Sequence, residues 1–324
     1  MSVKKTSFTI SINSLDDLLR CINLASLLEL SGWPKPGNVH RTQNFEDTRF
    51  EHFLAGIAAI QPNFRKLCER VSQLSFEEDN NFKFVKLGLF FKEAAEDMLK
   101  WQNGGNVLLG HILILAPLVA SATICLNSNQ LDLIDLKYFL CKIIDNSTLN
   151  DTLNLYEAIR TCNPGGLGEV EKYDVNSESS LVELKNDNIT LKKIFEISKN
   201  VDLISYEYST GFKIILDEGL PYFFNIFHQF GDPNIAIVNT YLKILSDYPD
   251  TLISRKIGIE EANRVSKAAS EILQHGGIST SEGLKMTNEL DNNLQERKGQ
   301  LNPGTTADLI AGVIFCALIF GFRV

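Results

Sequence analysis

Apolar residues recur along this chain at intervals of three and four positions, which places them on one face of an α-helix. The pattern is clearest between Ser14 and Gly32, where a capping hydroxyl and two acidic residues precede the apolar positions. Comparable stretches predict helices over residues 47–60, 83–101, 103–126, 131–145, 150–160, 191–227, 259–275 and 282–296, with others beginning near Pro233, Asp250 and Thr305 or Thr306. Strict alternation occurs only in F-T-I-S-I at residues 8–12, so the expected fold is all-α with at most one stray strand.

The length and composition of the chain favour one large folded unit. Its 324 residues lie at the upper edge of what a single hydrophobic core can serve, and 44% of them are hydrophobic. We expect residues 1–13 to form an N-terminal extension and residues 14–324 a single all-helical domain with a mostly buried central helix set. The polar and acidic composition of residues 169–188 predicts an exposed excursion from that domain.

Charge, cysteines and apolar runs exclude several classes of protein. A formal net charge of −9 argues against a general nucleic-acid-binding surface, which needs a basic field. The six cysteines are scattered without C-x-x-C spacing, so we interpret them as reduced core residues of a cytoplasmic protein. The N-terminus lacks the apolar run and the cleavage site of a secretory signal. Residues 307–322 are strongly apolar but short for a membrane span and include Asp308, which favours a buried helix.

Residues 33–51, W-P-K-P-G-N-V-H-R-T-Q-N-F-E-D-T-R-F-E, concentrate polar groups on a stiff connection between two predicted helices. Pro34 and Pro36 restrict the backbone, whereas Gly37 can adopt a positive φ, so the segment has a defined shape. Two cations and two neutral polar groups in it suit a polyphosphate. These candidate phosphate or nucleotide ligands are Lys35, Asn38, His40 and Arg41. The alternative is an ordinary helix connection with a charged, solvated rim.

Three acidic residues flank this connection. Asp47 and Glu51 are four positions apart, so on a helix they would share a face and could bind one Mg²⁺ ion. Asp47 is also a catalytic candidate. Glu29 lies in the last turn of the first predicted helix, one turn before the proline-rich segment. It is either a surface glutamate or a catalytic base that points into the segment.

A glycine-rich segment opens the most apolar predicted helix. Gly104, Gly105 and Asn106 could present free backbone N–H groups to a phosphate at the start of that helix. Their spacing matches neither the P-loop nor the dinucleotide-binding fingerprint, so the pattern alone is a weak signal. His111 lies among apolar residues, where a core histidine with satisfied hydrogen bonds is more common than a ligand. Three glycines in residues 165–168 mark a second segment whose backbone has a demanding geometry.

Two further acidic residues stand at predicted helix starts. Asp250 would cap a short segment that carries Arg255 and Lys256, two more candidate phosphate ligands. Structural salt bridges are the alternative for this cluster. Asp308 lies in the first turn of an otherwise apolar helix, where an unpaired charge is costly. The expected ligands of one or two Mg²⁺ ions are therefore Asp47, Glu51, Asp250 and Asp308.

As a set, these motifs resemble the triphosphoribosyl-dephospho-coenzyme A synthase family. The resemblance rests on six segments in the family's order, E-L-S-G-W-P-K-P-G-N-V-H-R, F-E-D-T-R-F-E-H-F-L, N-G-G-N, N-P-G-G-L-G, D-T-L-I-S-R-K-I-G and L-N-P-G-T-T-A-D-L. They span nearly the whole chain, from Ala25 to Gly312, and such colinearity is far more specific than any single motif. N-P-G-G-L-G and N-P-G-T-T-A-D-L are most similar to the archaeal-type branch.

The resemblance implies an all-helical, Mg²⁺-dependent enzyme that transfers the triphosphoribosyl group of ATP to the 2′-hydroxyl of 3′-dephospho-coenzyme A and releases adenine. Its substrates would be ATP and a dephospho-coenzyme A-like acceptor, and its product the precursor of a prosthetic group. In this interpretation Lys35, Arg41, Arg255 and Lys256 hold phosphates, and Glu29 is the base on the incoming hydroxyl. We expect no nucleic-acid or membrane partner, and a homodimer is compatible with the sequence.

One segment departs from the family pattern. Members commonly have N-T-H-K-G or N-T-N-L-G after the glycine-rich stretch, whereas here Asn106 is followed by V-L-L-G. Two alternatives therefore stay open. One is a related nucleotide or phosphoribosyl transferase of another cofactor pathway, and the other is a non-catalytic ATP-binding protein.

Overall fold

The computed structural model describes residues 8–76 and 79–324, and these residues form the expected all-α fold. The α-helices are α1 Leu15–Ser31, α2 Phe50–Ser72, α3 Leu87–Lys100, α4 Leu109–Ser128, α5 Leu133–Asp145, α6 Leu149–Cys162, α7 Ser180–Asn186, α8 Leu191–Ser198, α9 Leu203–Thr210, α10 Leu220–Phe230, α11 Pro233–Asp247, α12 Thr251–Ile257, α13 Ile259–Gln274, α14 Ser281–Gln295 and α15 Gly304–Ile319. Two 3₁₀ segments, η1 Asp79–Val85 and η3 Gly277–Ser279, and one π-helix, η2 Ile214–Gly219, complete the helical elements. Within the described residues, an isolated β-bridge between Thr9 and Asp132 takes the place of the expected stray strand at residues 8–12. Residues 1–7 of the expected N-terminal extension lie outside the described residues.

α4 is the central helix of the core, as its uniformly apolar sequence requires. Its residues from Ile112 to Cys125 are all buried, and the helix packs against α1, α2, α3, α5 and α15. By length and composition α4 could cross a membrane, but 89% of its most apolar window is buried inside the protein. Its apolar surface is therefore covered by neighbouring helices.

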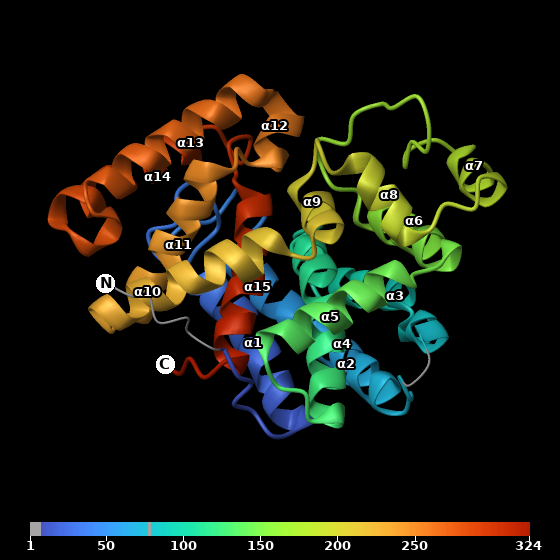
Figure 1. Ribbon diagram of the computed structural model, residues 1–324. Helices are drawn as coiled ribbons and strands as arrows, with labels where there is room; N and C mark the ends of the chain where they lie inside the picture. Colours follow the sequence, from blue (N-terminus) through green and yellow to red (C-terminus); the bar gives the residue numbers. More distant parts are fainter. Residues whose placement is uncertain (1–7, 77–78) are drawn as a thin grey trace.

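α15 is the second apolar helix of the core, which confirms the expectation of a buried helix near the C-terminus. Every residue from Leu309 to Ile319 is buried, and α15 packs against α1, α4, α10 and α11. In Figure 1, α15 stands in the middle of the molecule, with α13 and α14 on one side and α6, α7 and α8 on the other. The six cysteines are all free and five of them are buried, as expected for reduced core residues.

The second helix differs from its predicted bounds. It begins at Phe50 rather than Asp47, with the Arg49 N–H donating to His52 Nδ1 (3.1 Å), and it continues through Pro62 to Ser72. A proline inside a helix removes one backbone hydrogen bond. Here a buried apolar face extends on both sides of Pro62, so tertiary packing sustains the helix past the break.

Residues 163–190, which include the stretch 169–188 that was expected to be exposed, consist of irregular turns and the short helix α7. Arg160, at the end of α6, fastens this segment to the domain. The guanidinium donates to the carbonyl oxygens of Val175 (2.7 Å) and Ser177 (2.6 Å) and to the Ser180 hydroxyl (3.0 Å). The excursion is therefore tied along one side of α6.

The helical periodicity predicted across residues 191–227 is divided into α8, α9, η2 and α10. Gly211 and Phe212 adopt positive φ angles of 70° and 62° and end α9. The fully buried Glu207 of α9 then starts the π-helix, because its two carboxylate oxygens accept the N–H groups of Ile214 (2.8 Å) and Ile215 (3.0 Å). Burial raises the pKa of Glu207 to about 8, although both N–H donors oppose this shift.

The raised pKa of Glu207 predicts a pH dependence of folding stability. Stability contributed by the protonated carboxyl is fully present below its unfolded pKa of about 4.5 and is lost as the pH rises through about 8. We expect the free energy of unfolding of the wild-type protein to fall by a few kcal/mol relative to that of Glu207→Gln across this window, since one pKa unit corresponds to about 1.4 kcal/mol. Urea denaturation of both proteins at several pH values measures the difference, and parallel pH profiles would contradict it.

Candidate active site

A cavity of about 650 Å³ opens where the C-terminal end of α1 meets the first turns of α4 and α15 and the short helix α12. The segment after α6 and the start of α9 form its other side. Candidate residues from every part of the chain converge here, as a shared site requires. Those that line the cavity are Glu29, Asn38, Asp47, Gly105, Asn106, Arg255, Lys256 and Asp308.

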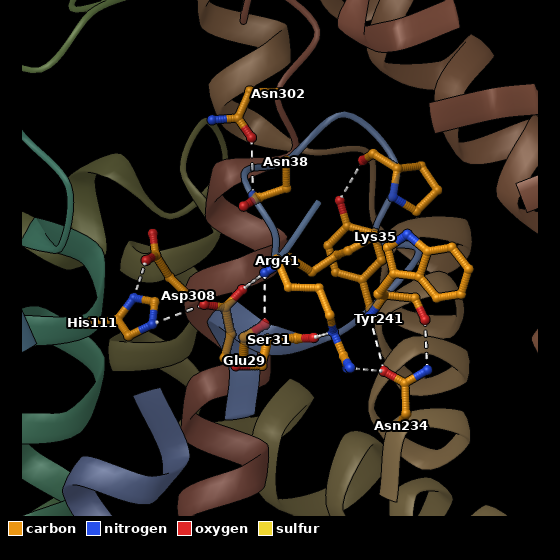
Figure 2. A network of polar contacts seen from close by, with 12 residues as sticks. Glu29, Ser31, Lys35, Asn38, Arg41, His111, Asn234, Tyr241, Asn302 and Asp308 are labelled. Carbon is orange, nitrogen blue, oxygen red and sulfur yellow. Dashed lines mark hydrogen bonds and ion pairs between the residues drawn. The ribbon is translucent and has the colours of Figure 1, made fainter. Parts of the chain in front are cut away.

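Four ionisable side chains form a continuous chain that runs from the buried Lys35 to Asp308 at the floor of this cavity (Figure 2). The Lys35 ammonium contacts Glu29 Oε1 and donates to the Glu29 backbone carbonyl oxygen (2.8 Å). Glu29 Oε2 forms an ion pair with His111 Nε2 at 3.3 Å, without the angle of a hydrogen bond. On the other side of the ring, His111 Nδ1 lies 2.7 Å from Asp308 Oδ1. We call these four residues the ionic chain.

The pKa values along the ionic chain follow from burial and from the neighbouring charges. Burial would lower the pKa of His111, but Asp308 and Glu29 raise it to about 9, so the imidazole is protonated at neutral pH. Burial would raise the pKa of Glu29, but Lys35 and His111 hold it below its ordinary value. Burial raises the pKa of Asp308 in spite of His111. Two cations thus face two carboxyl groups, which offsets the cost of burying each charge alone.

Lys35 does not reach the cavity, which corrects its expected role as a phosphate ligand. Its side chain is 0% exposed, and both of its contacts are to Glu29. The same contacts weaken the expected role of Glu29 as a base. Glu29 lines the cavity, but each of its carboxylate oxygens already faces a cation, and its pKa is lowered.

His40 and Arg41 also lie outside the cavity lining, so their expected nucleotide contacts are corrected. The His40 ring is buried with Nε2 2.9 Å from an oxygen of Asp291 on α14. Arg41 donates to the carbonyl oxygen of Ser31 (2.7 Å) and to the side-chain oxygen of Asn234 on α11 (3.1 Å). These contacts hold the proline-rich connection against three helices.

The four expected Mg²⁺ ligands do not gather into one site. Asp47 precedes α2 and so shares no helix face with Glu51, which pairs with Arg49 (3.3 Å) outside the cavity lining. Asp308 has the protonated His111 as its partner. Over residues 8–76 and 79–324, no three His, Cys, Asp or Glu side chains are grouped to hold a metal ion. Proteins commonly bind Mg²⁺ through one or two carboxylates together with substrate phosphates, and the exposed Asp47 in the lining fits that mode.

Asp250 is a structural cap, which corrects its expected role as a metal ligand. Its carboxylate is buried and accepts the N–H groups of Leu252 (2.9 Å) and Ile253 (3.1 Å) through Oδ1, and the N–H (2.7 Å) and hydroxyl (2.8 Å) of Thr306 through Oδ2. These four hydrogen bonds use the acceptor capacity of a carboxylate. The predicted cap of the short segment α12 is confirmed, and the same side chain also caps α15. Asp250 therefore fixes the α12 cations relative to Asp308.

The cations of α12 border the cavity beside the glycine-rich segment that follows α6. Arg255 donates to Asp202 Oδ1 (2.6 Å), which is one of the salt bridges that the sequence left open. Lys256 donates to the carbonyl oxygen of Gly299 (3.0 Å), and burial lowers its pKa. Gly166 has a positive φ of 78°, and a Cβ there would lie 3.2 Å from side-chain atoms of both cations. Glycine thus lets this segment approach the cations closely.

Three further expected residues, Gly105, Asn106 and Asn38, also line the cavity. Gly105 has a φ of 71°, and a Cβ there would meet no described atom within 4 Å, so this backbone faces open space. Asn106 accepts the Leu109 N–H (3.1 Å) and so caps the first turn of α4. The nearly buried Asn38 donates to the side-chain oxygen of Asn302 (3.0 Å).

His111 is a site residue that the sequence analysis interpreted as an ordinary core histidine. It lines the cavity and joins Glu29 to Asp308. Gly110 permits this arrangement, because a Cβ at that position would lie 1.8 Å from an oxygen of Asp308. A signal was present: His111 and Asp308 are isolated polar residues near the starts of two apolar helices, and isolated buried polar groups need partners.

The buried ion pair predicts a large stability effect for Lys35. We expect Lys35→Met to lower the free energy of unfolding by about 3 kcal/mol, because it removes one of the two cations that face Glu29 and Asp308 and so leaves an excess buried negative charge. The matched control Lys256→Met should change it by less than about 1 kcal/mol, and adding Glu29→Gln to Lys35→Met should recover part of the loss. Urea denaturation measures all four proteins. Wild-type stability in Lys35→Met, combined with loss of ATP binding, would restore the phosphate-ligand interpretation.

Two curated proteins are similar to this chain in sequence, and one solved structure is similar to it in fold. Over 305 residues the chain is 24% identical to Protein CitXG of Leuconostoc mesenteroides subsp. cremoris, covering 91% of this chain and 57% of that protein. Over 105 residues it is 30% identical to the 2-(5″-triphosphoribosyl)-3′-dephosphocoenzyme-A synthase of Klebsiella pneumoniae, covering 32% of this chain and 34% of that one. The chain thus spans well under two thirds of these relatives. A crystal structure from Archaeoglobus fulgidus, described as a candidate triphosphoribosyl-dephospho-coA synthase, superposes with a TM-score of 0.62 at 25% identity, covering 83% of this chain and all of that one.

A family model covers almost the whole chain. The model for CitG, ATP:dephospho-CoA triphosphoribosyl transferase, matches residues 15–323. The match includes every helix from α1 to α15 and all the residues that line the cavity. This chain therefore belongs to the ATP:dephospho-CoA triphosphoribosyl transferase family.

Proposed function

We propose that this protein transfers the triphosphoribosyl group of ATP to the 2′-hydroxyl of 3′-dephospho-coenzyme A and releases adenine. The observation that carries the proposal is the cavity itself, where cations at one border adjoin a carboxyl group at the floor, in a member of this family. A triphosphate needs the cations, and the transfer of a hydroxyl proton needs the carboxyl group.

The cationic border is where the triphosphate would bind. Arg255, Lys256 and the exposed Lys298 all line the cavity. The open backbone at Gly105, just before α4, lies in the same lining and could offer N–H groups to phosphate oxygens. This assignment keeps two of the four cations expected from the sequence and replaces Lys35 and Arg41.

The chemistry breaks the bond between C1″ of the ATP ribose and N9 of adenine, and forms a bond from C1″ to the acceptor oxygen. Such glycosidic cleavage passes through an oxocarbenium-like state, so both substrates must be held in place. Asp308 is the better candidate for the base that accepts the hydroxyl proton. It is partly exposed to the cavity, its pKa is raised, and no described residue donates a hydrogen bond to its second oxygen, Oδ2. Glu29 and His111 would orient it.

Mg²⁺ belongs to the proposal as the counter-ion of the triphosphate, whose charge it would neutralise. Asp47 is the exposed carboxylate of the lining that could contact a phosphate-bound ion. Asp250 and Glu51 are excluded from this role by their positions.

A second candidate is a related transferase with a different acceptor. Where the family commonly has polar residues, Val107 is 8% exposed and lines the cavity, and Leu108 is 1% exposed in the core. An apolar residue in the lining changes which groups an acceptor can present there. Adenine release from ATP that does not consume dephospho-coenzyme A would favour this candidate.

The reaction itself is the first test. Purified protein incubated with ATP, Mg²⁺ and 3′-dephospho-coenzyme A should release free adenine and form a product heavier by one triphosphoribosyl group. Liquid chromatography with mass spectrometry quantifies both in a single sample. ATP binding without adenine release under any of these conditions would support a non-catalytic protein.

Asp308→Asn tests the assignment of the base. We expect kcat to fall at least about 100-fold with little change in the KM for ATP, because the amide keeps a partner for His111 but cannot accept a proton. Asp217→Asn, at an exposed aspartate that pairs with Lys137 on the protein surface, is the matched control and should retain wild-type kcat. Equal activity of Asp308→Asn and wild type would remove Asp308 from the mechanism.

A further inference from the structure

One wall of the cavity is apolar and is built from three separate segments. They are α6, the residues between α6 and α7, and the pair α8 and α9 with its connecting turn. The apolar side chains they place in the lining are Leu155, Ile159, Leu167, Val170, Val175, Ile194, Phe195, Val201 and Ile204. The Phe195 ring stacks on Tyr208 with centroids 4.0 Å apart, which stiffens the α8 part of this surface. We call these residues the apolar wall.

The apolar wall extends from the buried floor of the cavity to its rim. Leu155 and Phe195 are nearly buried, Ile159 is partly exposed, and Val170 and Val201 are 60% and 65% exposed. Exposed apolar side chains gathered in the lining of a cavity mark a surface that a ligand can cover. Such a surface suits an extended ligand that runs outwards along it.

Polar groups within this wall already have partners. The Tyr156 hydroxyl donates to the carbonyl oxygen of Tyr173 (2.6 Å), and the Ser198 hydroxyl donates to that of Ile194 (3.2 Å). The Ser205 hydroxyl donates to Asp202 Oδ2 (2.9 Å). The wall therefore offers no cation and few free donors to a phosphate, so its occupant is largely uncharged.

The wall adjoins the cationic border. Arg255 pairs with Asp202, the residue that caps α9, and Ile204 of the wall follows two residues later. A ligand that lies across this junction needs phosphate charge at one end and an uncharged chain at the other. Of the two proposed substrates, only dephospho-coenzyme A has this form, because its diphosphate continues into a long pantetheine arm.

We propose that the apolar wall binds the pantetheine arm of the acceptor and so distinguishes dephospho-coenzyme A from other adenosine nucleotides. This inference rests on the proposed function for the identity of the acceptor. The adenosine ribose of the acceptor then lies at the floor near Asp308, its diphosphate passes Arg255, and its arm runs along α6 and α8 to the rim at Val170 and Val201.

Adenosine 5′-diphosphate is the probe for the arm, because it shares the ribose and the diphosphate of dephospho-coenzyme A and lacks only the pantetheine. Saturating inorganic tripolyphosphate is present in every titration, so that adenosine 5′-diphosphate does not bind at the proposed triphosphate site. Isothermal titration calorimetry compares the binding of the two compounds to the wild-type protein and to Ile159→Asn and Val201→Asp. Both substituted residues are partly or largely exposed, which favours retention of the fold, and circular dichroism checks it. Ile134→Asn, at a 78% exposed isoleucine of α5 that is absent from the lining, is the matched control.

We expect the wild-type protein and the Ile134→Asn control to bind dephospho-coenzyme A at least tenfold more tightly than adenosine 5′-diphosphate. Each wall variant should reduce that ratio severalfold through weaker dephospho-coenzyme A binding alone. Equal affinity of the two probes for wild type, or equal losses for both probes in the wall variants, would overturn the inference. The experiment measures binding and does not depend on turnover. A strong preference for dephospho-coenzyme A without any adenine release would contradict the proposed reaction but would still support the inference that the apolar wall binds the pantetheine arm.

Discussion

The ionic chain from Lys35 through Glu29 and His111 to Asp308 is the interaction on which the candidate site depends. Each of these groups would be costly to bury alone, and each is stabilised by the next. The four residues come from the end of α1, the following connection, α4 and α15. Their pairing therefore couples the positions of three core helices, and any displacement of one helix would leave a buried charge without its partner.

Asp250 adds a second constraint of the same physical kind. One buried carboxylate satisfies the first N–H groups of α12 and of α15, where the helix dipoles also favour negative charge. Arg255 and Lys256 lie on α12, and Asp308 lies on α15. A single side chain thus fixes the helix that carries these two cations relative to the helix that carries this carboxyl group.

The cavity divides into regions of different chemistry because different elements supply them. α12 and α15 contribute charge, the backbone before α4 contributes an open glycine, and α6, α8 and α9 contribute apolar surface. The excursion after α6 belongs to this arrangement, since Arg160 ties it beside the apolar side. A donor rich in phosphate and an acceptor with a long uncharged arm are complementary to these separate regions.

The sequence was enough to determine the all-α fold and the buried character of α4 and α15, because hydrophobic periodicity is a property of neighbouring residues. It also determined the family to which the chain belongs, because the six motifs and their order can be read along the chain. Asp308, Arg255 and Lys256, which the sequence analysis singled out, line the cavity. Only the tertiary structure decided which charges face the cavity. Lys35 and Lys256 look alike in sequence, but Lys35 is buried against Glu29, six residues before it, whereas Lys256 lies in the cavity lining. The packing of helices far apart along the chain decides this difference, because it encloses the Lys35–Glu29 pair and places His111 of α4 on the other oxygen of Glu29.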